Sequence, residues 1–385
     1  MAAKEASRLR ISFLQPSRAP YRIALLQELM PSYQIKIYYV AGAHDPNRVW
    51  ETQELTGVES LDPPHWTVVL GGKRFTFSPR AARDASRDAD VVVICTNILE
   101  FPTYLMAAIF AKLQRIPVLC LVTIGQDYDF FRSGGKLSKY ANILLRSLLG
   151  LLVKLSDFAI CYSKSGVREA KSWGVAGVTS SQYYPLEAEY GPENMLPSLH
   201  LRKEHTVELT ACIIGYISPR KGITEFLEAR RRLNLEDRLN IIIAGPLPAG
   251  DAFIQELKNS SWKNVNFIGS VGTAEKAKLF QQVDIMLFPT LHDSWGYVAN
   301  EAMYAGVPVI ASPHSEAAKD LIRHDDNGWV YADDAGLLNA FEQAANPEKL
   351  REVSLAARRS AVAFNGQALD AWRFAIAAVA KKGGS

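Results

Sequence analysis

The chain has 385 residues, of which 48% are hydrophobic and 22% are charged, a composition typical of folded proteins that leaves no room for extensive disorder. Its 43 basic and 40 acidic side chains give a net charge of +3, so the composition argues against a nucleic-acid partner. Because this length exceeds what one hydrophobic core usually supports, we expect two domains.

The cysteines and the N-terminus predict the compartment. The four cysteines lie in apolar runs without paired spacing, at Cys95, Cys120, Cys161 and Cys212. We interpret them as reduced core residues, which indicates a reducing environment. The N-terminus, MAAKEASRLR, lacks the apolar core of a signal peptide, and no apolar run reaches the roughly eighteen residues that a membrane span needs. The sequence therefore predicts a cytoplasmic protein, with peripheral contact at the inner face of a membrane as the alternative.

In the first half of the chain, short apolar runs alternate with helical stretches. The predicted strands are RLRISFLQ (8–15), QIKIYYV (34–40), WTVVL (66–70), ADVVVIC (89–95), IPVLCLV (116–122) and SDFAICYS (156–163). Continuous apolar runs of this kind are typical of parallel strands buried on both faces. The stretch ending at 29 predicts a helix, whereas 41–64 is predicted to be a loop. We expect one doubly wound domain over residues 1–190.

A second series of strands follows a stretch rich in proline and charge, at 191–206, that we predict to be the interdomain linker. The strands of this series are predicted in VELTACIIG, LNIIIAG, NVNFIG, VDIMLFP, VPVIAS and GWVY. They predict a second Rossmann-like domain over 207–365, so the fold class is α/β with two such domains facing across a ligand cleft. The last helical stretch, 366–382, is long enough to pack on either domain.

The segment HDSWGYVANEAMYAGVPVIAS, residues 292–312, gathers polar groups between two predicted strands. Asp293 and Glu301 are eight positions apart, about two helical turns if 295–304 is a helix, so both carboxylates would project toward one side. The helix N-terminus between them offers unpaired backbone N–H groups to a phosphate or a sugar hydroxyl. The alternative is structural, with Asp293 capping the helix and Glu301 as a charge near its N-terminus.

Three motifs in the second half resemble those of one enzyme family. They are GYISPRKGITEFLEA at 215–229, LNIIIAGP followed by NVNFIGSV, and DSWGYVANEAMYAGVPVIAS, which matches an E-x7-E segment with Asp in the first acidic place. Together they resemble the retaining glycosyltransferases of the GT-B fold, glycosyltransferase family 4 (glycosyl transferases group 1). The likeness covers about Val207 to Asp334. In the first half it is topological, apart from PYR at 20–22 and the stretch 156–175.

This resemblance implies an enzyme that transfers a sugar from a nucleotide-diphosphate sugar to a glycan, lipid-linked or small-molecule acceptor, with no cofactor and no required metal. It implies that Glu301 accepts hydrogen bonds from the ribose and that Asp293, a methylene shorter than the usual Glu, meets the donor sugar. The predicted donor-binding residues are Gly215, Arg220, Lys221, Gly245, Ile268, Asp293, Ser294, Trp295, Gly296, Tyr297 and Glu301.

Arg220 and Lys221 suit the chemistry of a diphosphate leaving group. Negative charge grows on the diphosphate as the glycosidic bond breaks, so cations and helix N-termini are needed beside it. The alternative is that an Arg-Lys pair beside a glycine forms an ordinary solvated turn. The family usually has a second phosphate-binding Arg after the strand glycine, and here that residue is Tyr216.

The first half departs further from the family. The loop 16–20 lacks glycine, and the stretch LVTIGQDYDFFRSGG lacks the histidine that lies near the reacting sugar. Gln126 and Asp127 are, with Asp293, our catalytic candidates. The acceptor-side candidates are Arg18, Tyr21 and Arg22. Asp127 and Asp129 also suggest a metal pair, although the surrounding architecture argues against one.

Two further alternatives remain open. The segment 136–156, KLSKYANILLRSLLGLLVKLS, is either a crossover helix of the sheet or a basic amphipathic helix lying on an anionic membrane. The altered positions at Tyr216, Asp293 and 125–127 leave a catalytically silent sugar-nucleotide-binding protein or partner subunit as the rival to an active enzyme. A sugar-nucleotide epimerase of the same fold is a lesser option.

Overall fold

The computed structural model describes residues 8–17, 20–42, 58–70, 73–87, 89–123, 136–182, 208–247 and 250–383. The chain divides into two compact units: unit 1 is Met1–Tyr184 with Gly366–Ser385, and unit 2 is Pro185–Asn365. Each unit contains its own parallel sheet, which confirms the predicted α/β class with two parallel-sheet domains. The predicted linker, 191–206, lies outside the described residues.

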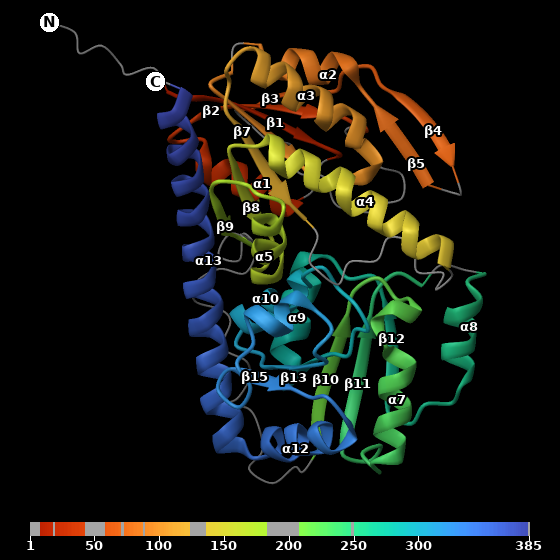
Figure 1. Ribbon diagram of the computed structural model, residues 1–385. Coiled ribbons are helices and arrows are strands. Elements are labelled where there is room, and N and C mark those ends of the chain that lie inside the picture. The colour runs from red at the N-terminus through yellow and green to blue at the C-terminus, as the bar shows by residue number, and fades with distance from the viewer. Residues whose placement is uncertain are drawn as a thin grey trace, which may run out of the picture. The chain divides into compact units, whose positions relative to one another are not determined.

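Unit 1 contains a seven-stranded parallel sheet in the order β3-β2-β1-β6-β7-β8-β9 (Figure 1). Its strands are β1 (Arg10–Gln15), β2 (Gln34–Tyr39), β3 (Glu59–Leu61), β6 (Val91–Cys95), β7 (Val118–Val122), β8 (Phe158–Cys161) and β9 (Val178–Ser180). Its helices include α1 (Pro20–Leu29), α2 (Pro79–Ala85), η1 (Ile98–Glu100), α3 (Phe101–Leu113), α4 (Lys136–Leu155) and α5 (Lys164–Ser172). The strand order reverses between β1 and β6, and such a reversal is where open α/β sheets bind ligands.

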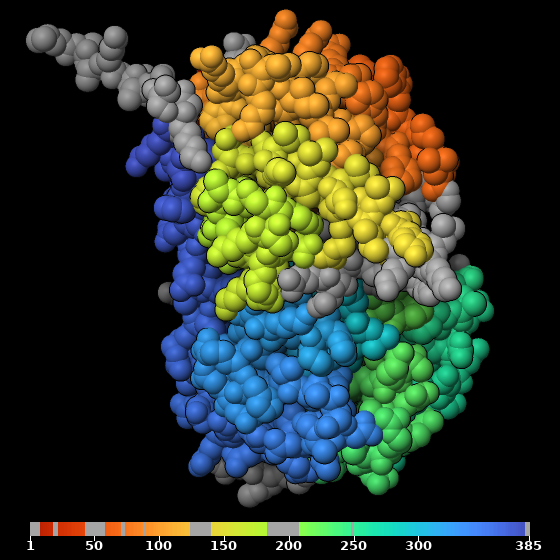
Figure 2. All heavy atoms as spheres, in the orientation of Figure 1, coloured from red at the N-terminus to blue at the C-terminus, as the bar shows by residue number. Residues whose placement is uncertain are grey.

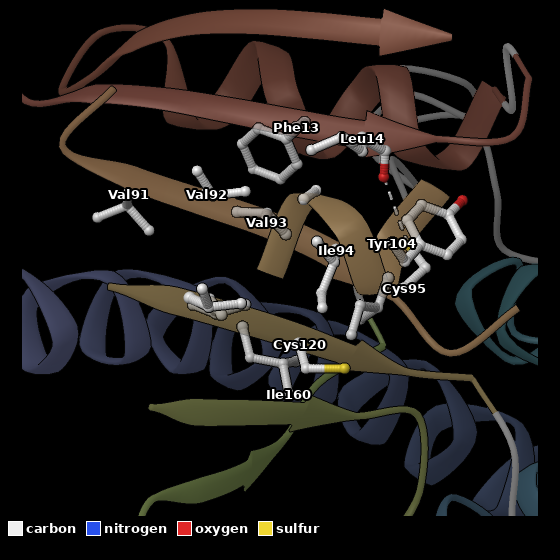
Figure 3. Packing of buried hydrophobic residues seen from close by; sticks show 14 of the residues in the cluster. Phe13, Leu14, Val91, Val92, Val93, Ile94, Cys95, Tyr104, Cys120 and Ile160 are labelled. Carbon is white, nitrogen blue, oxygen red and sulfur yellow. Dashed lines mark hydrogen bonds between the residues drawn. The ribbon is translucent and has the colours of Figure 1, made fainter. Parts of the chain in front are cut away.

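The centre of this sheet is buried on both faces. All five residues of β6 and all five of β7 are buried, as continuous apolar runs predict. Figure 3 shows Phe13, Val93 and Cys120 among the packed side chains of β1, β6 and β7. The Cys95 thiol donates to the Leu14 carbonyl at 3.7 Å, and burial raises the pKa of Cys95 to about 11. All four cysteines are free and buried, which confirms their predicted place in the core.

WTVVL forms a strand as predicted, but the prediction that this strand is parallel and buried on both faces was wrong. These residues form β4 (Trp66–Leu70), which pairs antiparallel with β5 (Lys73–Phe77), and all five are exposed, with Trp66 at 67%. The composition of a five-residue apolar run does not distinguish a strand of a hairpin from a buried parallel strand. Here the run pairs with the next strand along the chain. The predicted loop 41–64 also contains β3, which extends the parallel sheet by pairing with β2.

Helix α4 joins β7 to β8 and has two different halves. Leu149, Leu152 and Val153 are buried in the core of unit 1, as a crossover helix requires. Nearer its N-terminus, Tyr140 and Leu144 are exposed, and Figure 2 shows α4 in yellow at the surface of unit 1. Within the part of the chain that the structure describes, no helix combines the length and apolar character needed to cross a membrane.

The last helix, α13 (Pro347–Gly383), contributes residues to both units. Its C-terminal part, which includes the predicted helix 366–382, packs Trp372 and Ile376 into the core of unit 1. The Trp372 ring lies 6.0 Å from that of Phe13, centroid to centroid. Apolar residues at intervals of three and four place one face of this helix in the core.

Unit 2 contains a six-stranded parallel sheet in the order β12-β11-β10-β13-β14-β15. Its strands are β10 (Leu209–Ile214), β11 (Leu239–Ala244), β12 (Val265–Gly269), β13 (Ile285–Phe288), β14 (Val309–Ala311) and β15 (Gly328–Val330). Its helices include η2 (Pro219–Lys221), α7 (Ile223–Arg232), α8 (Ala252–Asn259), α9 (Thr273–Gln282), α10 (Tyr297–Tyr304), α11 (Glu316–Asp320) and α12 (Asp334–Ala345). All six predicted strands of this half are confirmed. The order reverses between β10 and β13, so the loops that follow these two strands meet at one edge of the sheet.

Candidate functional site

The loop after β10 fits closely against the end of β13. The short helix η2 ends at Lys221, and Gly222 is the cap residue between η2 and α7, with a left-handed φ of +63°. A Cβ on this residue would lie 2.2 Å from the carbonyl oxygen of Pro289. Both the backbone angle and this close approach require glycine, so the sequence SPRKG sets how η2 meets β13.

Hydrogen bonds then fasten the two loops together. The carbonyl of Arg220 accepts from the backbone N–H of Leu291 at 2.9 Å and from the hydroxyl of Thr290 at 3.2 Å. In return, the Arg220 guanidinium donates to the carbonyl of His292 at 2.7 Å. The cation-bearing loop is thus held in one position by the strand end that precedes Asp293.

Asp293 lies between the two predicted phosphate-binding cations. Its Oδ2 accepts from Lys221 Nζ at 2.9 Å and from Arg220 Nη1 at 3.1 Å. Burial alone would raise the pKa of Asp293, but the charges of Lys221 and Arg220 outweigh it and hold the pKa below its ordinary value. Asp293 is therefore a carboxylate at neutral pH, and the three charges form a compact cluster at the ligand-binding edge of the sheet.

The loop that carries Asp293 is anchored by Trp295. The buried indole of Trp295 donates to Asn300 Oδ1 at 2.7 Å and stacks on Phe364 with centroids 5.4 Å apart. The backbone N–H of Trp295 donates to Asp293 Oδ1 at 3.4 Å. This N–H, which was predicted to hold a sugar or phosphate, here contacts the Asp293 carboxylate.

Helix α10 begins at Tyr297 and not at Trp295, two residues later than predicted. Its N-cap residue is Gly296, so Asp293 is not the cap that the structural alternative proposed. The predicted donor-binding residues Ser294, Gly296 and Tyr297 all lie at this helix start. Their backbone groups are near Asp293 in sequence and at the edge of the sheet where a helix N-terminus favours an anion.

Glu301 is buried on α10 and has a partner that the sequence did not predict. Lys276, on α9, donates to Glu301 Oε1 at 2.5 Å, and the two side chains are only 15% and 4% exposed. The Glu301 carboxylate is thus held by a cation from the neighbouring helix. Sequence reasoning missed Lys276 because a single lysine in a helix is ordinarily a solvated surface residue.

Two other predicted donor-binding positions lie along the same edge. Gly245 directly follows β11, and a Cβ there would lie 1.9 Å from the carbonyl oxygen of Gly215, so the two strand ends approach too closely for a side chain. Ile268 lies on the outermost strand, β12, and is exposed. Tyr216, where the family usually has Arg, is also exposed.

Of the candidates in the first half, the structure describes the side chain of Arg22. Arg18, Gln126 and Asp127 lie outside the described residues, as do Asp129 and the side chain of Tyr21. Arg22 is buried, donates to the hydroxyl of Tyr162 at 2.7 Å and lies 5.9 Å from the Trp372 ring centroid. The described residues contain no group of three or more His, Cys, Asp or Glu side chains placed to hold a metal ion.

A family model matches the part of the chain that contains the site of unit 2. Residues 201–357 match the model of the family described as glycosyl transferases group 1. These matched residues, which we refer to as the group 1 domain, make up less than half of the chain. This match includes both cations, Asp293, Lys276 and Glu301, so the group 1 domain contains the whole cluster described above.

Curated relatives match part of this chain. MJ1607 of Methanocaldococcus jannaschii, named an uncharacterized glycosyltransferase, is 30% identical over 121 residues, which are 31% of this chain and 30% of that protein. The phosphatidyl-myo-inositol mannosyltransferase of Mycobacterium leprae is 30% identical over 161 residues, 40% of this chain and 41% of that protein. The chain thus matches less than half the length of either curated relative.

Solved structures extend the likeness beyond the group 1 domain. The crystal structure of Anabaena HepE in complex with UDP covers 95% of this chain and 100% of its own, with a TM-score of 0.67 and 16% identity. Such identity shows the fold alone. The predicted GT-B fold is therefore confirmed, with the group 1 domain as its second Rossmann-like half.

Proposed function

We propose that this chain is a retaining glycosyltransferase that moves a hexosyl group from a nucleotide-diphosphate sugar to a hydroxyl of a glycan, lipid-linked or small-molecule acceptor. The observation that carries this proposal is the convergence of Lys221, Arg220 and Glu301 at one edge of the unit 2 sheet. Two cations suit a diphosphate, and a buried carboxylate on the adjacent helix suits a ribose.

In this proposal the cations stabilise the leaving group. The bond between the anomeric carbon and the diphosphate oxygen breaks, and the acceptor oxygen forms the new glycosidic bond on the same face. The acceptor's proton passes to the leaving diphosphate, which departs as a nucleoside diphosphate. Lys221 and Arg220 stabilise the negative charge that develops on the leaving diphosphate. They can do so because the site already holds them in position before the reaction.

Asp293 has a double role in the proposed reaction. Its carboxylate positions the two cations, and it is the acid that would accept a hydrogen bond from a hydroxyl of the donor sugar. A carboxylate has two oxygens, and Oδ2 is bonded to the cations while Oδ1 accepts a long bond from Trp295. Gln126 and Asp127 remain proposed catalytic positions, and we propose that no metal is required.

A panel of nucleotide sugars tests which donor the enzyme uses. The relative in Mycobacterium leprae is named a mannosyltransferase, and the Anabaena structure contains UDP. We would therefore offer uridine and guanosine diphosphate derivatives of glucose and mannose, with and without an acceptor mixture, and measure release of nucleoside diphosphate.

Matched variants make this assay decisive. We expect at least one donor to release nucleoside diphosphate, and the product to show retained anomeric configuration by proton NMR. In Lys221→Ala and Glu301→Ala we expect the rate of release to fall at least a hundredfold, which corresponds to about 3 kcal/mol. Lys278→Ala, at an exposed position of α9, is the control and should retain activity. Tight nucleotide binding without turnover on any donor would favour the silent sugar-nucleotide-binding protein, and acceptor-independent conversion of the donor would indicate an epimerase.

We also propose that α4 gives this enzyme peripheral contact with the inner face of a membrane, where a lipid-linked acceptor would lie. Residues 136–155 contain four basic and no acidic side chains, and Tyr140, Ile143 and Leu144 are exposed. Sedimentation with anionic vesicles should be lost in Ile143→Ser/Leu144→Ser and kept in Leu113→Ser, which alters an exposed leucine of α3. Equal sedimentation of both variants would contradict membrane contact through α4.

A further inference from the structure

The hairpin of β4 and β5 carries an exposed apolar strand on its outer side. Strand β5 contacts η1 and α3, whereas β4 lies on the side of the hairpin that is turned away from these helices (Figure 1). All five residues of β4 are exposed, and Trp66, Val68, Val69 and Leu70 are each more than half exposed. Contiguous exposed apolar surface of this kind often marks an interaction site.

Strand β4 lacks the features that normally protect the edge of a sheet. Within the described residues it pairs with β5 alone, so its outer side presents backbone groups for further pairing. The two outer strands of the seven-stranded sheet have only three residues each, and one of them, β3, carries Glu59 in an ion pair with Lys36. By contrast, β4 has five residues and contains neither a charge nor a proline. Such an edge is well suited to pair with another strand.

The register of the hairpin indicates which backbone groups of β4 point outward. Leu70 faces Lys73 across a connection of two residues. In such a hairpin the closing residues, and every second residue before them, exchange backbone hydrogen bonds with the partner strand, while the residues between them point their N–H and C=O groups to the opposite side. The outward groups of β4 are therefore the N–H and C=O groups of Thr67 and Val69.

We propose that β4 pairs antiparallel with β4 of a second copy of this chain, about a two-fold axis at Val68. This register places Thr67 of each copy opposite Val69 of the other, so that the outward N–H and C=O groups of the two strands satisfy one another. Pro63 and Pro64, which have no N–H to donate, limit the pairing at its N-terminal end. This dimer does not depend on the proposed function.

The side chains of β4 are complementary to themselves in this register. Trp66 faces Leu70 of the other copy and Val68 faces its own counterpart, so the apolar side chains on this face form one continuous row, and cross-strand pairs of this kind stabilise a sheet. The nearest described charge, Arg74 on β5, is kept away from its counterpart. The two copies of β5 would be three strand spacings apart, about 14 Å, which exceeds the Debye length of about 8 Å at physiological salt.

The size of the interface sets the affinity that we expect. Stable complexes bury roughly 1,200–2,000 Å² of surface, and weaker, reversible complexes bury less. One five-residue strand from each copy belongs to the second class, so we expect a Kd of about 1–100 µM for the dimer. Because the contact consists of apolar side chains and backbone hydrogen bonds, its strength should change little with salt.

Sedimentation equilibrium of the full chain, from about 1 to 300 µM, tests whether the dimer forms. We expect Val68→Lys to weaken association at least tenfold, because it places two ammonium groups opposite each other at the two-fold axis. The matched control is Leu113→Lys, which adds the same charge at an exposed leucine of α3 and should associate as the wild type does. A wild type that stays monomeric throughout, or association that is equal in the two variants, would overturn the proposal.

Cysteine cross-linking tests the register without relying on the lysine variant. In the proposed dimer the two Cα atoms at position 68 lie about 4.5 Å apart, which a disulfide can span, whereas those at position 70 lie about 14 Å apart. Mild oxidation should therefore join two copies of Val68→Cys but not of Leu70→Cys. The four native cysteines are buried, so the wild type should stay unlinked. Equal cross-linking of the two variants would overturn the pairing about Val68.

A lipid surface is the competing occupant of β4. Sedimentation with vesicles of phosphatidylcholine and phosphatidylglycerol measures this alternative for the wild type and for Trp66→Ser. Vesicle binding by a monomeric wild type that is lost in Trp66→Ser would assign β4 to a membrane and overturn the proposed dimer. Dimerisation that is the same with and without vesicles is the result we expect.

Discussion

The ammonium of Lys221 lies 2.9 Å from Oδ2 of Asp293, and this contact joins the loop after β10 to the loop after β13. The two cations proposed to receive a diphosphate are thus partly neutralised by one carboxylate of the same site. A bound phosphate and Asp293 would compete for Lys221 and Arg220, and they would repel each other if both stayed within a few ångströms.

The first prediction follows from this competition. Replacing Asp293 by Asn should strengthen binding of a nucleoside diphosphate by about three- to tenfold, roughly 1 kcal/mol, because one negative charge near the phosphates is removed. The same change should slow sugar transfer. Calorimetric titration of both proteins measures the affinities, and a weaker nucleotide complex in Asp293→Asn would contradict the competition.

A second prediction concerns pH. The pKa of Asp293 is lower in the folded chain than its ordinary value of 3.8. The ionised carboxylate therefore contributes its full stabilisation above pH 3.8, and this stabilisation is lost as the pH falls through the lower pKa of the folded state. Wild type should therefore exceed Asp293→Asn in free energy of unfolding by about 1–3 kcal/mol at pH 7, and the difference should shrink below about pH 4. Urea unfolding of both proteins between pH 7 and pH 3 provides the comparison. A difference that grows on acidification would reverse the sign we expect.

Two glycine substitutions should act in opposite directions. Gly222→Ala places a Cβ 2.2 Å from the Pro289 carbonyl at a φ of +63°, and we expect a loss of about 1–3 kcal/mol in stability with weaker nucleotide binding. Gly366→Ala, in the interior of α13, meets no atom within 4 Å in the described structure and should gain about 0.5–1 kcal/mol. Thermal unfolding and nucleotide titration distinguish them, and a neutral Gly222→Ala would mean that η2 is free to move away from β13.

The thiols provide a further test of the core. Burial raises the pKa of all four cysteines, and that of Cys95 to about 11, so thiolate is scarce at neutral pH and reagent access is blocked. A thiol reagent should label none of them in the native chain and all of them in denaturant. Rapid labelling of a native cysteine would place it outside the packed sheets.

Much of the fold could be predicted because a strand buried on both faces needs a continuous apolar run. The strand at Ile285–Phe288 follows this rule, and so do Val91–Cys95 and Val118–Val122 of unit 1. The run at Trp66–Leu70 is also apolar but exposed, and it pairs with its neighbour in sequence, Lys73–Phe77, in a hairpin outside the parallel sheet. Periodicity in one run does not reveal which partner strand is available.

The candidate site residues could be named one by one from the sequence, but the contacts among them could not. The motifs identified Lys221 and Asp293 separately, yet they are 72 positions apart, and their pairing depends on how two loops meet. Lys276 lies in no motif that we used. Its spacing from Leu279 and Phe280, which places a charge on the inward face of a helix, was the available signal.

A crystal structure with a bound nucleoside diphosphate tests the central proposal most directly. We predict phosphate oxygens at hydrogen-bonding distance, about 2.7–3.2 Å, from Lys221 Nζ and the Arg220 guanidinium, with the ribose hydroxyls at Glu301. A nucleotide that binds away from the loops after β10 and β13, with the contacts of Lys221 to Asp293 and of Lys276 to Glu301 unchanged, would contradict it.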